Sequence, residues 1–411
     1  MKSTFLKEMS DRGYISQCTD IDNLDDLLSR NRVKAYIGFD CTADCLHVGS
    51  LMQIMILRLL QKHGHQPIVL FGGGTTLIGD PSGKDSTRKI IQKKTIKNNI
   101  LGIRDNFKKL LKQKKNKAIL VDNENWLGKL NYINFLREVG SHFTINKMLT
   151  FDSVKIRLER QQSLSYMEFN YMILQAYDFF QLNKKYNCSL QLGGSDQWGN
   201  IVNGIELIRR INKKESYGLT TPLITTASGA KMGKTENGAI WLNEKKLSAY
   251  DYWQFWRNTD DKDVVKFLKY FTDLSLNEIS DLETNEKNIN KLKIILANEA
   301  TALLHGKKKA KDAENTAKKT FEQGGVGKNL PVIKIKKSIL INGLNVLEFL
   351  SFTKIMSSKS EARRAIKNNG IKIDDKALTN IDKIISYKDF KENNYIKISF
   401  GKKKHFLIKL D

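Results

Sequence analysis

The sequence predicts an α/β protein whose mostly parallel sheet is followed by an all-helical stretch and a small α+β module. Short apolar runs alternate with helical patterns through residues 1–246, which is typical of βαβ units and a parallel sheet. From about 247 to 321 the pattern is helical only. Residues 344–411 then read as two helices, a turn at Gly370 and strands that end in a hairpin around Gly401.

Each element is justified by its local pattern. Residues 1–32 read as a helical lead-in with leucines on one face. The expected strands are short apolar or β-prone runs, at 33–39, 67–71, 118–121, 189–192 and 222–225. Helices are expected at 49–61 and about 86–115. Residues 125–187 contain helical segments only, so we expect an insertion between two halves of the sheet.

The domain boundaries follow from these shifts in pattern. We expect a first domain over 1–246, a helical domain over 247–321 and a small C-terminal domain over 344–411. The glycines of 324–327 mark the clearest break, within a linker over 322–343.

Composition narrows the class of protein. The 411 residues carry a formal net charge of +25, which favours a polyanionic partner such as nucleic acid. A compositional bias toward Lys, Asn and Ile would also produce this charge. No apolar run is long enough for a membrane span, and residues 1–11 lack the apolar core of a secretory signal. Four cysteines do not make a disulfide scaffold, so a reducing cytoplasm is expected. Cys41, Cys45 and His47 lack a fourth ligand, so no metal site is predicted.

Residues 36–50 read as a strand that runs through a turn into a helix. A helix N-terminus at the carboxyl end of a strand favours anions, because its free N–H groups and dipole are positive. His47 could donate to phosphate there, and Gly49 has no side chain to block a bound ring. A surface or capping histidine is the alternative.

Two glycine-containing loops carry lysines but are not P-loops. Residues 79–83 and 229–235 each fall one residue short of the P-loop spacing. Their lysines could stabilise the charge of a leaving pyrophosphate, or they could belong to solvated surface loops.

A helix and a turn carry further polar groups. Tyr171, Gln175 and Asp178 are spaced by four and three residues, which places them on one helix face. This face could bind an ammonium group and a hydroxyl, or it could be an interface with incidental polar residues. The 193–200 turn has glycines that admit a nucleotide, and Asp196 could bind ribose hydroxyls.

Taken in order, these motifs resemble bacterial-type tyrosyl-tRNA synthetases along essentially the whole chain. Residues 47–50 are similar to the "HIGH" signature of class I synthetases, and 231–235 to the "KMSKS" signature. The resemblance implies a Rossmann-like catalytic domain whose insertion at 125–187 carries a homodimer interface. It also implies that 344–411 is an S4-like RNA-binding domain, which holds 15 Lys and Arg against 8 Asp and Glu.

The resemblance implies a role for each matching residue. The tyrosine phenol is assigned to Tyr36 and Asp178, and the ammonium group to Tyr171, Gln175 and Asp80, with Gln197 close by. The residues assigned to ATP are Gly38, Asp40, Thr42, His47, Gly49, Ser50, Gly194, Asp196 and Lys234. The residues that the family uses around the leaving pyrophosphate correspond to Lys84, Arg88, Lys231, Lys234 and Thr235, which with His47 form the catalytic set. The RNA contacts are assigned to Arg363, Arg364 and Lys367.

The implied reaction joins L-tyrosine to ATP, with Mg²⁺, and then transfers tyrosyl to tRNA(Tyr). Two residues depart from the family pattern on the ATP side: Ser50 replaces a histidine, and Cys41 replaces a proline. The nearest alternative enzyme is a tryptophanyl-tRNA synthetase, which should lack the Tyr36 and Asp178 pair. A non-catalytic RNA-binding protein on the same fold is the other alternative. The basic region 84–117 could face tRNA or solvent.

Overall fold

The computed structural model describes residues 1–82, 91–227, 229, 232–235, 238–322, 330, 332–390, 394–401 and 404–411. These residues form two compact units, one of Met1–Leu247 with Asn258–Leu304, the other of Ser248–Arg257 with His305–Asp411. The predicted domain boundaries stay predictions. Within the described residues, no helix is both long and apolar enough to cross a bilayer.

The first unit is built on a six-stranded sheet in the order β1-β6-β5-β2-β3-β4. All neighbouring strands are parallel except β1, which pairs antiparallel to β6. The strands are β1 (Gln17–Cys18), β2 (Lys34–Phe39), β3 (Gln66–Phe71), β4 (Ile119–Asp122), β5 (Leu190–Gly194) and β6 (Tyr217–Thr221). The chain proceeds from β2 to β3 and β4 on one side, and adds β5 and β6 on the other. Ligands bind at such a switch point, at the carboxyl ends of the strands.

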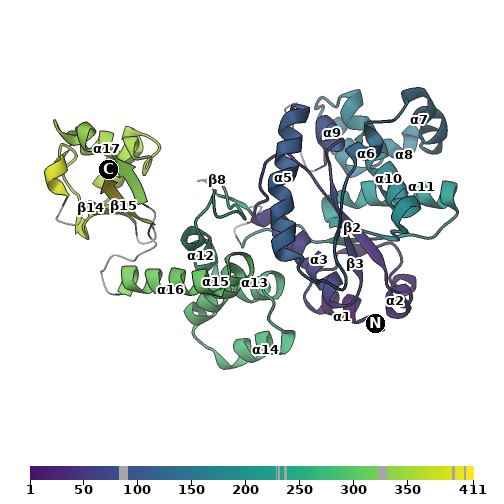
Figure 1. The fold of residues 1–411 in the computed structure, drawn as a ribbon, viewed down its shortest axis with the longest axis horizontal. Helices are drawn as coiled ribbons and strands as arrows, with labels where there is room; N and C mark the ends of the chain where they lie inside the picture. Colours follow the sequence, from purple (N-terminus) through teal and green to yellow (C-terminus); the bar gives the residue numbers. More distant parts are fainter. Residues whose placement is uncertain are drawn as a thin grey trace. The chain divides into compact units, whose positions relative to one another are not determined.

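Helices cover both faces of this sheet (Figure 1). Helix α3 packs on β3 and α5, whereas α11 packs on β5, β6 and α10. The helices before β5 are α1 (Thr4–Asp11), α2 (Ile21–Arg30), α3 (Leu51–Lys62), α4 (Thr75–Ile78), α5 (Lys93–Leu110), α6 (Glu124–Leu127), α7 (Tyr132–Glu138), α8 (Ile145–Leu149), α9 (Asp152–Glu159) and α10 (Tyr166–Tyr186). Those after it are α11 (Trp198–Asn212), α13 (Val264–Phe271), α14 (Leu276–Asn285) and α15 (Ile289–His305). A two-stranded ribbon joins β7 (Lys234–Thr235) to β8 (Gly238–Ala239).

The sheet core forms where apolar strand residues meet α10. Tyr36, Ile68, Leu70 and Phe179 belong to one buried cluster. Helix α10 begins with a capping box, because the Ser165 hydroxyl accepts from the Glu168 backbone N–H while the Glu168 carboxylate accepts from the Ser165 N–H.

One expected strand is wrong. The strand predicted at 222–225 lies five residues earlier, at β6 (Tyr217–Thr221). Pro222 has no N–H to donate to the ladder, so the chain leaves the sheet at that residue. Parallel β-structure at the other four expected positions is confirmed, and so are the helices of 125–187 and 247–321.

The second unit contains the packed helices α12 (Ala249–Arg257) and α16 (Lys307–Glu322) and an α+β fold. This fold has a sheet in the order β12-β11-β14-β15-β9, against which α17 and α18 bury one apolar core. Its elements are β9 (Val332–Ile335), β10 (Leu344–Asn345), α17 (Val346–Phe352), α18 (Lys359–Lys367), β11 (Ile371–Ile373), β12 (Lys376–Ala377), β13 (Ile384–Ile385), β14 (Tyr395–Phe400) and β15 (Lys404–Leu410). Strands β14 and β15 form the hairpin expected around Gly401. Because β9 pairs with β15, we propose that this domain begins at β9, within the predicted linker.

Candidate active site

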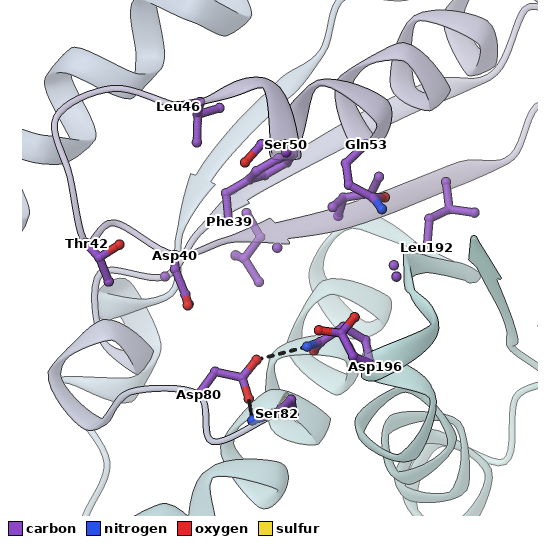
Figure 2. A pocket seen from close by; sticks show the side chains of 18 of the residues that line it. Phe39, Asp40, Thr42, Leu46, Ser50, Gln53, Asp80, Ser82, Leu192 and Asp196 are labelled. Atoms are coloured by element: carbon purple, nitrogen blue, oxygen red, sulfur yellow. Dashed lines mark hydrogen bonds between the residues drawn. The ribbon is translucent and has the colours of Figure 1, made fainter. Parts of the chain in front are cut away.

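A cavity of about 590 Å³ opens at the carboxyl ends of β2 and β5, at the switch point of the sheet. Its walls come from the turn after β2, the first turns of α3, the inner face of α10 and the turn between β5 and α11 (Figure 2). The predicted residues that line it are Tyr36, Gly38, Asp40, Thr42, His47, Gly49, Ser50, Asp80, Tyr171, Gln175, Asp178, Gly194, Asp196 and Gln197. The fold therefore brings together residues as far apart in the sequence as Tyr36 and Gln197.

A buried carboxyl group lies on the α10 wall of the cavity. Asp178 accepts hydrogen bonds from Asn123 Nδ2 at 2.8 Å and from Trp126 Nε1 at 2.7 Å. Burial raises the pKa of Asp178 to about 7, although these two hydrogen bonds oppose the shift by stabilising the carboxylate. Asp178 is therefore a hydrogen-bonding group whose charge changes near neutral pH.

Tyr36 lies at the same end of the cavity, on β2. Its ring packs 5.2 Å from the ring of Phe179, and its side chain is 1% exposed. The hydroxyl is buried and has no hydrogen-bond partner among the described residues. Burial, together with the Asp178 carboxylate, raises the pKa of this phenol well above its ordinary value. A buried hydroxyl without a partner is costly, so a ligand that bonds to it gains affinity.

A chain of amides joins Asp80 to α10. Asp80 accepts from the Ser82 backbone N–H at 2.8 Å and from Gln197 Nε2 at 2.9 Å. Gln197 Oε1 in turn accepts from Gln175 Nε2 at 3.2 Å, and Gln175 Oε1 accepts from Asn200 Nδ2 at 3.0 Å. Asp80 and Ser82 face Asp196 across the cavity in Figure 2. These bonds fix a carboxylate and amide oxygens, the acceptors that an ammonium group requires.

The turn before α3 forms the wall that was expected to bind phosphate. His47 Nδ1 accepts from the Gly49 backbone N–H at 3.0 Å, so a neutral ring carries its proton on Nε2. A Cβ at position 49 would lie 2.6 Å from His47 Cε1, so only glycine lets the ring lie over this turn. Ser50 precedes α3 and makes no side-chain cap.

Some predicted residues are not placed at the cavity. Lys84, Arg88 and Lys231 lie outside the described residues, as do 324–327. Lys234 and Thr235 form β7, for which only the backbone is described. The RNA-binding candidates Arg363, Arg364 and Lys367 are exposed on α18.

The sequence did not reveal several residues that line the cavity or bond to its walls. Asn123 and Trp126 follow β4, and polar residues directly after a predicted strand would have been a signal for them. Gln53 lies one turn after Ser50 and points into the cavity (Figure 2). Its Nε2 bonds Thr221 Oγ1 at 3.1 Å, and its Oε1 is buried without a hydrogen-bond partner in the described part of the chain.

Family comparisons agree with this geometry. A family model described as "tRNA synthetases class I (W and Y)" matches residues 28–322, and one described as "Tyrosine--tRNA ligase SYY-like C-terminal domain" matches 321–408. A tyrosine–tRNA ligase of Pelagibacter ubique is 60% identical over 408 residues, which is 99% of each chain. The chain belongs to the tyrosine–tRNA ligases. These enzymes are class I aminoacyl-tRNA synthetases, so the predicted fold class and enzyme class are confirmed.

Other tyrosine–tRNA ligases show the same relationship. The enzyme of Rickettsia bellii is 52% identical over 410 residues, covering 99% of this chain and all of its own. The crystal structure of a C-terminally truncated mitochondrial tyrosyl-tRNA synthetase of Aspergillus nidulans has a TM-score of 0.70 at 30% identity. It covers 77% of this chain, and this chain covers 94% of it.

Proposed function

We propose that the cavity activates L-tyrosine with ATP. Its inner end would bind tyrosine, and its outer end would bind ATP. In the first step a tyrosine carboxylate oxygen attacks the α-phosphorus of ATP, forming tyrosyl-adenylate and releasing pyrophosphate. In the second, a ribose hydroxyl of the terminal adenosine of tRNA(Tyr) attacks the tyrosyl carbonyl and releases AMP. The observation that carries the proposal is that Tyr36 and Asp178 share one cavity with the His47–Gly49 turn.

The inner end of the cavity, which carries Tyr36 and Asp178, is proposed to bind the phenol of the substrate tyrosine. The tyrosine hydroxyl can donate to the Asp178 carboxylate and accept from the Tyr36 hydroxyl, which otherwise lacks a partner among the described residues. Asp80, Tyr171 and Gln175, with Gln197, are proposed to hold the ammonium group. Phenylalanine would leave the buried Tyr36 hydroxyl unpaired, which costs about 1–3 kcal/mol.

The outer end of the cavity, which carries the His47–Gly49 turn, is proposed to bind ATP. His47 Nε2–H and Thr42 would donate to the phosphates, while Gly38, Gly49, Ser50 and Gly194 leave room for the nucleoside. Asp196 is proposed to bind the ribose. Lys84, Arg88, Lys231, Lys234 and Thr235 are proposed to stabilise the leaving pyrophosphate. Catalysis is then positioning and charge stabilisation, without a covalent intermediate on the protein.

Magnesium is proposed to enter with ATP. Its preferred ligands are carboxylate and phosphate oxygens, and Asp40 and Asp196 present carboxylates to the cavity. A bound magnesium ion would supply positive charge next to the phosphates. Among the described residues, no group of three or more His, Cys, Asp or Glu side chains could hold a metal without such a ligand.

The remaining proposals concern assembly and RNA. Large apolar side chains are exposed along 132–166 in numbers that suit a homodimer interface: Tyr132, Ile133, Leu136, Ile145, Leu149, Ile156, Leu158 and Tyr166. The exposed basic residues of α18, Arg363, Arg364 and Lys367, are proposed to contact tRNA phosphates. A cytoplasmic location is proposed because all four cysteines are free thiols.

Exchange of labelled pyrophosphate into ATP tests the activation step. Exchange that depends on tyrosine is expected, and exchange driven better by tryptophan would contradict the assignment of Tyr36 and Asp178. The full chain with Arg363, Arg364 and Lys367 changed to Ser should keep exchange and lose tRNA charging. Equal loss of both activities would mean that α18 has no separate RNA role.

A further inference from the structure

The segment of residues 239–246 pairs with the turn that carries His47. Val48 N–H donates to the Ile240 carbonyl at 2.8 Å, and Leu242 N–H donates to the Leu46 carbonyl at 2.9 Å. His47 and Trp241 face each other between these two bonds as an antiparallel bridge. The backbone on both sides of His47 is therefore tied to a segment that lies almost 200 residues later in the sequence.

The side chains extend this pairing. The indole of Trp241 lies edge-to-face with the His47 ring, with 6.4 Å between ring centroids and 70° between planes. Lys246 Nζ lies over the Trp241 ring, 4.7 Å from its centroid, and forms an ion pair with Asp44, three residues before His47. The Asp44 backbone packs closely on α5, because a Cβ at Gly102 would clash with its carbonyl oxygen. Lys246 thus links Trp241 to Asp44, in the segment just before His47.

The same segment connects to the second class I signature. Ile240 N–H donates to the Gly233 carbonyl at 3.2 Å. Gly233 has φ +100° and lies against the first signature so closely that a Cβ there would be 2.7 Å from Gly49 N and 2.9 Å from His47 Nδ1. Residues 239–246 therefore contact both signature segments at the point where the two segments meet.

We propose that Trp241 and Lys246 are positioning residues that hold the His47 ring in the orientation in which its Nε2–H meets the triphosphate. This proposal rests on the proposed role of His47. The constraints on the ring include the Gly49 N–H on Nδ1, the paired backbone, and the Trp241 indole. The first two belong to the backbone, so the indole is the constraint that a substitution can remove while the turn is kept.

If Trp241 positions His47, substituting Trp241 should lower the rate of pyrophosphate exchange and change tyrosine binding little. The contacts described for Tyr36 and Asp178 are with Phe179, Asn123 and Trp126, at the inner end of the cavity. Misplacing a catalytic group by about 1 Å can cost on the order of 100-fold in rate. We therefore expect Trp241→Leu to lower kcat for pyrophosphate exchange by roughly 10-fold to 100-fold and to leave the tyrosine KM within about twofold.

The test is a double-mutant cycle between positions 47 and 241, read by pyrophosphate exchange. Trp241→Leu is measured in the wild-type and the His47→Ala backgrounds, and Trp241→Phe should restore most of the rate. Once His47 is gone, removing the indole should lower kcat by less than about twofold, because the group that it positions is absent. Lys246→Met should give a smaller loss in kcat. Lys245→Met is the matched control, because no side-chain contact is described for Lys245, and it should keep the wild-type rate.

Several outcomes would overturn the proposal. Additive losses in the double variant, or a parallel rise of the tyrosine KM, would mean that Trp241 only supports the fold. A rise of the ATP KM at unchanged kcat would mean that Trp241, which also lines the cavity, binds the nucleotide directly. Failure of the proposed function has a different signature: the wild type would lack tyrosine-dependent exchange, or His47→Ala would keep the full rate.

Discussion

Trp126→Phe tests how the cavity controls the charge of Asp178. The substitution keeps an aromatic ring and removes the Nε1–H that Asp178 accepts at 2.7 Å. A hydrogen bond to a charged group contributes about 1.5–3 kcal/mol, which corresponds to roughly 1–2 pKa units. The pKa of Asp178 should therefore rise from about 7 to between roughly 8 and 9, because the carboxylate loses one of its two donors.

The expected effect on tyrosine binding depends on pH. A carboxyl group with a raised pKa gains its charge as pH rises through that pKa, so the variant should be poorly ionised at neutral pH. At pH 7 about half of the wild-type carboxyl is ionised, against roughly 1–10% in the variant. If the phenol donates to the carboxylate, the tyrosine KM at pH 7 should rise by roughly 5-fold to 50-fold. At pH 8.5 the penalty should shrink to roughly 1-fold to 4-fold, since roughly a quarter to three quarters of the variant's carboxyl is then ionised.

Pyrophosphate exchange at varied tyrosine, from pH 6.5 to pH 8.5, measures this profile. The ATP KM should not change, since Asp178 lies at the other end of the cavity from His47. Trp253→Phe removes an indole from the second compact unit and controls for a general effect of the substitution. A tyrosine KM that is unchanged at pH 7, or raised equally at every pH, would refute the reasoning.

Three further predictions concern other parts of the chain. Gln53→Leu removes a buried acceptor and should raise the ATP KM by roughly 2-fold to 10-fold with the tyrosine KM unchanged, as pyrophosphate exchange would show. Arg157→Met removes the guanidinium that pairs with the buried Glu168 carboxylate, both side chains being 3% exposed, and should lower the free energy of unfolding by about 3–5 kcal/mol in urea titrations. Restoration by Glu168→Gln would confirm the cause. Ile133→Glu, at a side chain that is 68% exposed, should shift a dimer to monomers in sedimentation velocity, and an unchanged oligomeric state would exclude this face.

The sequence predicted those parts of the site that are carried by one element. Tyr171, Gln175 and Asp178 could be placed together because helical spacing alone puts them on one face, and all three line the cavity. The strand–turn–helix around His47 was predictable for the same reason, since a β-prone run, a glycine and an apolar helix follow one another.

The parts that failed depend on contacts between distant elements. Asn123 and Trp126 reach Asp178 only because β4 is added to the sheet next to β3, a neighbour relation that periodicity does not contain. The strand expected at 222–225 is wrong because an apolar pattern alone does not reveal that Pro222, which cannot donate to a ladder, ends the pairing. The role of Trp241 could not be predicted, because nothing local indicates that residue 241 pairs with residue 47.

The two ends of the cavity differ in their electrostatics: the inner end holds a buried carboxyl group, and the outer end holds a donor suited to an anion. The inner end buries a carboxyl group whose pKa is raised to about 7, and the donors on Asn123 and Trp126 oppose that rise by stabilising the carboxylate. A ligand that brings a further donor gains from this setting, whereas an apolar ring of similar size does not. The outer end carries an imidazole that, when neutral, has its proton on Nε2, which suits an anion whose charge grows during the reaction. Because the donors at the two ends come from different elements, we infer that tyrosine selection and phosphate chemistry can be altered separately: through residues 123 and 126 at the inner end, and through residues 53 and 241 at the outer end.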